Sequence, residues 1–170
     1  MKDFCLSSYM AFRYIWKDGM DFYPGFTHRN YRPLQAEERI PVTTAADIDR
    51  EIQQQIDALY QQYDSIGILL SGGMDSANIA SYLKPGSHAY TFISSTGVFD
   101  DDAERAKQYC QKFQLQHHLI DITFDDYKKY TPIVMASKWA PAHSIEPQIY
   151  KAAIQAKKDG VQMILVGESA

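Results

Sequence analysis

The sequence predicts a doubly wound α/β fold, in which helices cover both faces of a parallel sheet. Short apolar segments alternate along the chain with segments whose apolar residues recur every three or four positions, as strands and amphipathic helices do. Such alternation produces right-handed βαβ units and therefore a parallel sheet. A glycine-rich turn at residues 71–76 (SGGMDS) follows the first predicted strand, in the place where sheets of this kind bind their ligands.

The first part of the chain differs in character from the rest. Residues 1–42 are predicted to form an aromatic-rich N-terminal arm, and residues 43–170 a single nucleotide-binding domain. Within the arm, residues 6–16 are expected to make a short helix, and Asp18-Gly19 is a turn signal. We interpret the arm as a hydrophobic segment packed on the domain; an interface with a further domain is the alternative.

The domain is expected to begin with a helix capped by Thr43 or Thr44, whose apolar residues repeat every four positions. Helices with one apolar face are then predicted at residues 77–83, at 101–113 and at 145–158. A further helix at residues 124–138 is expected to break near Pro132, because the residue before a proline disfavours helical dihedrals.

Four short apolar segments rich in β-branched and aromatic residues are predicted to be strands. They cover residues 66–70, 88–94, 117–123 and 161–167. The loops at residues 71–76, 94–100 and 167–170 each follow a strand, so they are expected to converge on one cleft.

Composition excludes several classes of function. A net charge of −4 argues against a nucleic-acid module, which usually presents a basic face. The apolar stretches are too short for a membrane span, and the first residues show no signal peptide. Cys5 and Cys110 do not form a disulfide pattern, so a cytoplasmic location is expected.

The turn at residues 71–76 has the chemistry of a phosphate site. Its glycines allow a tight turn and a close approach of backbone to ligand, and the N–H groups at the start of the next helix attract anions. Ser71 and Ser76 add hydroxyl donors. Asp75 would repel phosphates unless a divalent cation lay between them, so its presence indicates Mg²⁺.

Two motifs carry a resemblance to a known family. The loop lacks the lysine of G-x-x-x-x-G-K-[ST] and the spacing of G-x-G-x-x-G, but it resembles the S-G-G-x-D-S pyrophosphate loop of the ATP pyrophosphatases. Residues 167–170 (GESA) resemble the G-E-[GS]-[AS]-D motif of the asparagine synthetase C-terminal domain family. Asp102-Ala103-Glu104, His117-His118 and Tyr31-Arg32-Pro33 are more loosely similar to that family.

The resemblance implies an adenine nucleotide alpha hydrolase-like fold, Rossmann-like with three layers. It also implies an AMP-forming carbon–nitrogen ligase that cleaves ATP between the α and β phosphates. Such an enzyme joins AMP to a small carboxylate substrate, and an amine then displaces the AMP. ATP and Mg²⁺ are the expected ligands, with ammonia, an amine donor or a separate glutaminase as a possible partner.

The resemblance assigns roles to individual residues. Ser71, Gly72, Gly73 and Ser76 would hold the pyrophosphate, and Asp75 would bind Mg²⁺. Leu69, Leu70, Phe92 and Ile93 would flank adenine, and Gly167 would lie against the nucleoside. Glu168 would be the acid–base carboxylate that deprotonates the amine, a role open to a strand-end carboxylate whose pKa is tuned by partial burial.

Other polar residues are interpreted as structural. His117 and His118 are adjacent in a predicted strand, so their side chains face opposite ways and cannot easily bind one ligand. Lys138, Trp139 and His143 are expected in a loop that could reach the substrate, but a structural role is favoured for them as well.

The chain departs from the family pattern in three ways. Cys5 does not directly follow the initiator Met, as the family's glutaminase nucleophile does, so no glutaminase activity is expected. The family's second metal-binding Asp and its downstream lysine do not occur. The sequence thus looks like the first part of a synthetase domain, and by itself it is expected to bind nucleotide without completing the reaction. A non-catalytic nucleotide-binding module and another pyrophosphatase, tRNA-modifying or NAD-synthetase-like, are the alternatives.

Overall fold

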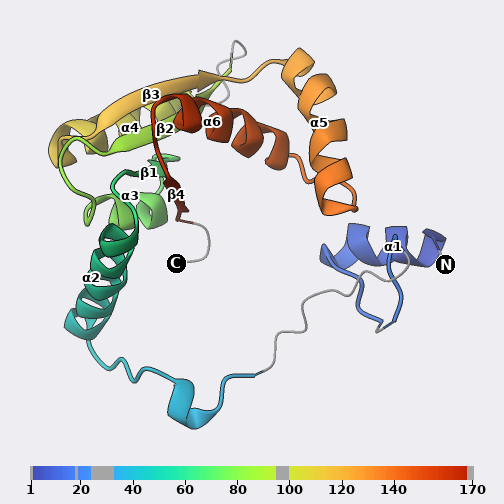
Figure 1. The fold of residues 1–170 in the computed structure, drawn as a ribbon, viewed down its shortest axis with the longest axis horizontal. Coiled ribbons are helices and arrows are strands. Elements are labelled where there is room, and N and C mark those ends of the chain that lie inside the picture. Colours follow the sequence, from blue (N-terminus) through green and yellow to red (C-terminus); the bar gives the residue numbers. More distant parts are fainter. Residues whose placement is uncertain (1, 18, 24–32, 95–99, 168–170) are drawn as a thin grey trace.

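The computed structural model describes residues 2–17, 19–23, 33–94 and 100–167. In these residues one parallel sheet has the strand order β3-β2-β1-β4 (Figure 1). The strands are β1 (Ile66–Leu69), β2 (His88–Ile93), β3 (Gln116–Asp121) and β4 (Met163–Val166). The chain passes from β1 to β2 to β3, then returns to pair β4 with the other side of β1. The direction of winding therefore reverses between β1 and β4, which is the topological switch point.

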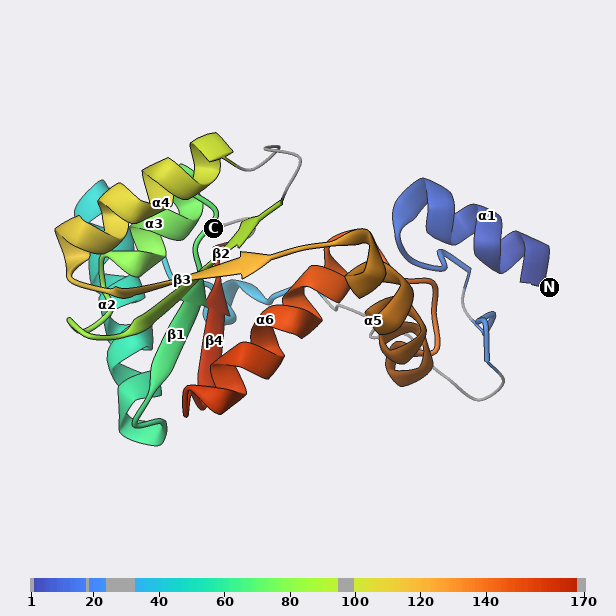
Figure 2. The same ribbon diagram turned by 90° about the horizontal axis from the view of Figure 1, so that it is seen from above.

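Helices cover both faces of the sheet (Figure 2), which confirms the predicted doubly wound α/β fold. On one face lie α2 (Ala45–Gln62), α3 (Met74–Ala80) and α4 (Asp100–Phe113). On the other lie α5 (Phe124–Lys138) and α6 (Glu146–Lys158). The side chains of β1 alternate between the two faces. Ile66, Ile68 and Leu70 enter the core beneath α2 to α4, and Leu69 enters the core beneath α6.

The N-terminal arm contains α1 (Lys2–Phe12) and a short 3-10 helix, η1 (Ala36–Glu38). The first helix was predicted over residues 6–16, and this is wrong in both bounds. It ends at Phe12 because Arg13 has a positive φ of 64°. The buried Ser8 then fixes the turn that follows: its hydroxyl donates to the Tyr14 carbonyl (2.8 Å) and accepts from the Trp16 N–H (3.1 Å).

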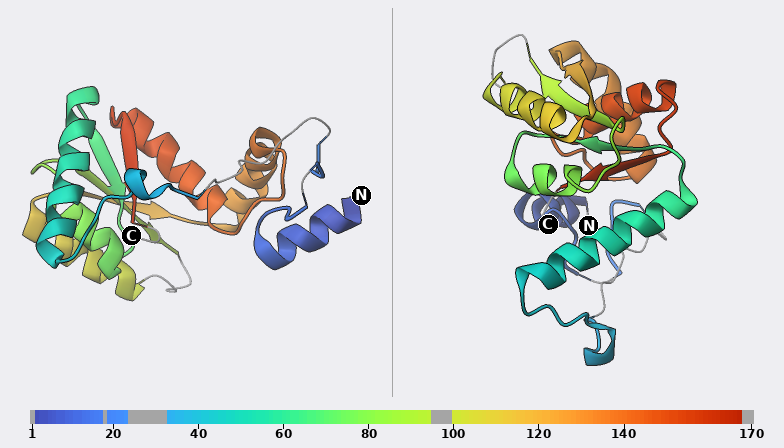
Figure 3. Two further views of the ribbon diagram at one scale, coloured as in Figure 1. Left: turned by 90° about the horizontal axis from the view of Figure 1, so that it is seen from below. Right: turned by 90° about the vertical axis from the view of Figure 1, so that its left-hand side faces the viewer.

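The first part of the arm, α1 and the turn after it, packs beside the end of α5 rather than over the sheet (Figures 2 and 3). Cys5, Tyr9 and Ile15 are buried there, in contact with Ala140. The Lys138 amine donates to the Tyr9 hydroxyl at 3.1 Å. This contact agrees with the packing predicted for the first part of the arm, whereas residues 33–42 are exposed. The boundary at residue 42 stays a prediction.

The predicted break in α5 is wrong, because the helix continues through Pro132. Two buried side chains, Tyr130 and Val134, hold the helix in place on either side of the proline. The helix also has a firm start, since the Thr123 hydroxyl accepts from the Asp126 N–H and the Asp126 carboxylate accepts from the Thr123 N–H. Packing and capping together outweigh the single backbone donor that proline lacks.

The lowered pKa of the Asp126 carboxylate predicts how the stability of the fold changes at acid pH. Burial alone would raise the pKa of Asp126, but hydrogen bonds from Lys151 and Thr123 outweigh it and lower the pKa from 3.8 to about 2. Because this pKa is lower in the folded than in the unfolded chain, the carboxylate stabilises the fold above pH 3.8. That contribution disappears as the pH falls towards 2. Between pH 3.8 and pH 2, urea unfolding should therefore show a smaller loss of unfolding free energy in Asp126→Asn than in the unmodified chain. An equal loss in both proteins would contradict the lowered pKa of Asp126.

Candidate functional site

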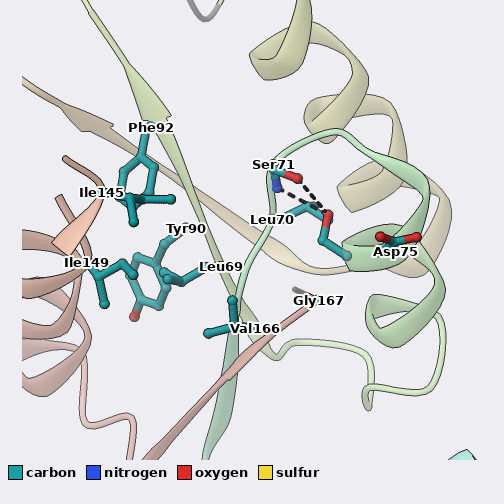
Figure 4. Close-up of a pocket in the computed structure, with 11 residues that line it drawn as sticks. Leu69, Leu70, Ser71, Asp75, Tyr90, Phe92, Ile145, Ile149, Val166 and Gly167 are labelled. Atoms are coloured by element: carbon teal, nitrogen blue, oxygen red, sulfur yellow. Dashed lines mark hydrogen bonds between the residues drawn. The ribbon is translucent and has the colours of Figure 1, made fainter. Parts of the chain in front are cut away.

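A cavity of about 320 Å³ lies at the switch point, beyond the carboxyl ends of β1 and β4 (Figure 4). This volume is in the range of small-molecule sites. One end of the cavity is polar and the other apolar (Figure 4). The lining residues are Leu69, Leu70, Ser71, Asp75, Ser76, Tyr90, Phe92, Ile145, Ile149, Val166 and Gly167.

The polar end is built on a pair of serine hydroxyls. Ser76 lies in the first turn of α3, and its hydroxyl is 3.1 Å from the Ser71 hydroxyl and accepts from the Ser71 N–H at 3.2 Å. The Gly73 N–H donates to the Ser71 hydroxyl at 3.4 Å. These bonds draw the loop into a closed turn. Since α3 has only seven residues, its dipole is short, and hydroxyls and loop N–H groups must supply most of the affinity for an anion.

The loop rests on the start of α4. Gly72 has a positive φ of 76°, and a Cβ atom built there would lie 2.4 Å from the Asp102 carbonyl oxygen. Arg105 reaches back from α4 and donates to the Gly72 carbonyl at 3.3 Å while pairing with Asp102. Sequence reasoning did not identify Arg105, because its proximity to the loop depends on how α4 packs. The sequence signal for Arg105 was its position three residues after Asp102, a spacing at which opposite charges on a helix form ion pairs.

Gly167 closes the other wall of the cavity. It follows β4, and a Cβ atom at this position would lie 2.4 Å from the Ser76 Cα and 2.5 Å from its backbone nitrogen. Only glycine allows the end of β4 to approach the first turn of α3 this closely. The contact brings two segments about ninety residues apart in sequence against each other at the loop.

The apolar end comes mainly from β2 and α6. Phe92, predicted to flank adenine, lines the cavity together with Tyr90. Ile93, also predicted to flank adenine, does not line the cavity, because adjacent side chains of a strand point to opposite faces of the sheet. Ile145 and Ile149 enter from the start of α6 and, with Tyr90 and Val166, were missing from the predicted site. The one sequence signal for these residues was the prediction that Ile149 lies on the inward face of its helix.

Asp75 lies at the polar end, on the side of the serine pair away from Phe92 (Figure 4). The residue is exposed. Among the described residues it has no ion-pair partner, whereas Asp102 and Asp126 are both paired. A carboxylate and two hydroxyls are hard oxygen ligands, which suit Mg²⁺. The residues present therefore fit the cation that the sequence predicted.

The remaining predicted residues fall into two groups. Glu168 lies outside the described residues. Lys138, Trp139 and His143 do not line the cavity; they hold the arm and the start of α6 instead. Lys138 is the last residue of α5 rather than part of a loop, and its amine pairs with Glu146. Trp139 packs against Tyr23 with ring centroids 3.7 Å apart, and the His143 N–H donates to Glu146.

His117 and His118 point to opposite faces of the sheet, as predicted. His117 Nε2 is 2.9 Å from the Thr91 hydroxyl. His118 Nε2 is 2.9 Å from His88 Nδ1 on the other face. Neither lines the cavity.

Comparisons with known proteins give one family match and a distant structural match. A family model described as "Asparagine synthase" matches residues 47–170, which is more than half of the chain. No curated protein gives a significant match. One solved structure with a similar fold is described as a predicted subunit of tRNA methyltransferase from Methanocaldococcus jannaschii. The two sequences are 22% identical, and the TM-score is 0.37. The match covers 61% of this chain and 52% of the solved chain, so it spans about half the length of the solved protein. So distant a likeness carries no functional argument.

In the described residues, no helix is both long and apolar enough to cross a membrane.

Proposed function

The chain belongs to the asparagine synthase family, and from that premise we propose that it carries out the adenylating half of an amide-forming reaction. In this proposal ATP and a small carboxylate react to give an acyl-adenylate and pyrophosphate, and an amine then displaces AMP. The observation that supports it most directly is the single cavity in which a hydroxyl and carboxylate end meets an apolar end.

The two ends of the cavity suit the two ends of ATP. We place the pyrophosphate against residues 71–76, where the Ser71 and Ser76 hydroxyls can donate to its oxygens. The adenine ring would lie in the apolar end, with Tyr90, Phe92 and Ile149 as its neighbours. The α-phosphate would then lie between them, near the ends of β1 and β4.

The chemistry follows from charge movement at the α-phosphorus. A carboxylate oxygen bonds to it, the bond to the pyrophosphate oxygen breaks, and negative charge moves onto the pyrophosphate. Hydroxyl and N–H donors already fixed around the loop can stabilise that charge without reorganising. Mg²⁺, held through Asp75, would neutralise part of the same charge when bound.

The second half of the reaction needs a base. When the amine attacks the acyl carbon and AMP leaves, the nitrogen must lose a proton. We assign this role to Glu168, the residue that follows the cavity-lining Gly167 in the sequence. Because Cys5 lies in α1 and is fully buried, we expect the nitrogen to arrive as ammonia, as an amine, or from a separate glutaminase.

The identity of the products tests the proposal. ATP, Mg²⁺ and a mixture of small carboxylates are incubated with hydroxylamine, which traps acyl-adenylates as hydroxamates. The assay is run on the 170-residue chain and on the full product of its gene, whatever its length. Consumption of ATP should yield AMP, pyrophosphate and hydroxamate in equal amounts, and pyrophosphate should exchange into ATP only when a carboxylate is present. Release of ADP and phosphate would overturn the proposal, as would saturable ATP binding by both proteins with no AMP formed.

A further inference from the structure

A second group of polar side chains lies at the opposite end of the sheet from the cavity. His88 begins β2, His118 lies in β3, and Asp159 directly follows α6. Of the described residues, these three are the ones gathered closely enough to share a metal ion, with one ligand atom from each within 4.8 Å of the others. All three lie on the face of the sheet covered by α6.

The strand register explains the gathering. His88 and Tyr90 point to the same face of β2, because side chains alternate along a strand. Tyr90 pairs with His118 of β3, so His118 lies beside both. The His88 Nδ1 and His118 Nε2 atoms are 2.9 Å apart, and the two rings are nearly parallel, at 22°. The two nitrogens therefore face each other across a gap that holds one proton.

The carboxylate of Asp159 is held in a fixed orientation. One oxygen accepts from the Tyr90 hydroxyl at 2.9 Å, and the other accepts from the Gln155 amide at 2.9 Å. The first of these oxygens is 3.8 Å from His118 Nδ1. The side chains of His118 and Asp159 are 27% and 18% exposed, so an ion from solvent can reach them.

We propose that His88, His118 and Asp159 form a binding site for a divalent transition metal of the Zn²⁺ class. Two imidazole nitrogens and a carboxylate, with a water in the fourth position, are a common zinc ligand set. In tetrahedral coordination with Zn–N bonds of about 2.0–2.1 Å, the two nitrogens are about 3.3 Å apart. For a metal to replace the shared proton, the two nitrogens must separate by a few tenths of an ångström, and the rings must turn so that both lone pairs point at the ion. The ion would tie β2, β3 and the end of α6 together, on the far side of Tyr90 from the serine pair.

Zinc titration tests the proposal on the 170-residue chain. Calorimetry is performed with excess Mg²⁺ and without nucleotide, so that Mg²⁺ occupies exposed carboxylates such as Asp75. The chain should bind one Zn²⁺, and its melting temperature should rise with zinc concentration because the ion binds only the folded state. His118→Ala and His88→Ala should each weaken binding at least tenfold and abolish the rise in melting temperature.

A matched control is the neighbouring His117→Ala. This variant removes an imidazole from the same strand but from the opposite face, where it contacts Thr91, and its zinc affinity should match that of the unmodified chain. Circular dichroism confirms that each variant is folded. Cobalt(II) substitution gives an independent readout, since a tetrahedral site has an absorption band that His118→Ala should lose. Absence of a zinc site in the unmodified chain, or equal affinities for His118→Ala and His117→Ala, would overturn the proposal.

Discussion

Replacing Asp75 with asparagine should weaken the binding of Mg·ATP at least tenfold, while the binding of metal-free adenosine stays nearly unchanged. Of the described residues that line the cavity, Asp75 is the one with a carboxylate, and it stands beside the serine pair that we assign to the pyrophosphate. Loss of a charged metal ligand commonly costs a factor of ten or more, or about 1.4 kcal/mol. Asparagine retains the shape and an oxygen of the side chain, so the change isolates the charge.

Asp125→Asn is the matched control for this measurement. Like Asp75, Asp125 is the second residue of a helix, and its side chain is 87% exposed. It does not line the cavity, so its loss should not alter nucleotide affinity. Titration calorimetry on the three proteins, with and without Mg²⁺, distinguishes the outcomes. Equal Mg·ATP affinities for Asp75→Asn and the unmodified chain would remove the metal-binding role.

Replacing Gly167 with alanine should abolish nucleotide binding and destabilise the fold. The new Cβ would lie 2.4–2.8 Å from three backbone atoms of Asp75 and Ser76, and backbone cannot yield as a flexible side chain can. The end of β4 must therefore move away from α3. This separates the two walls of the cavity and distorts the serine pair. Overpacking of this kind typically costs about 1–3 kcal/mol, and the distorted loop would lose affinity in addition.

Gly73→Ala is the matched control, because it adds a Cβ atom to a glycine of the loop without a clash in packing. At Gly73 the nearest contact of an added Cβ is the Ser71 hydroxyl at 3.4 Å, an ordinary contact distance. Its stability should therefore stay close to that of the unmodified chain, although nucleotide binding can still fall if phosphate approaches the backbone there. Urea unfolding and nucleotide titration of both variants check these expectations. A Gly167→Ala protein with unchanged stability would contradict the packing that we describe.

The succession of strands and helices along the chain, the doubly wound fold and the position of the loop could be predicted from the sequence alone. These follow from local patterns, since each strand is a short apolar segment and each long helix carries a repeat of apolar residues. The loop at residues 71–76 was readable because its chemistry lies within six consecutive positions. Local sequence patterns predicted less accurately the bounds of helices that are stabilised by tertiary packing. The helix through Pro132 and the end of α1 at Phe12 depend on buried side chains and on the Ser8 hydroxyl.

Which residues share a site depends on the packing of the elements against one another. Ile145 and Ile149 form the apolar end of the cavity only because α6 crosses the face of the sheet beside β2 and β4, and Arg105 reaches the loop only because α4 packs behind it. The pairing of His88 with His118 likewise depends on the register between two strands. Each of these contacts joins residues from different elements, distant in sequence. Their distances are set by how helices pack on a twisted sheet, which local sequence patterns do not specify.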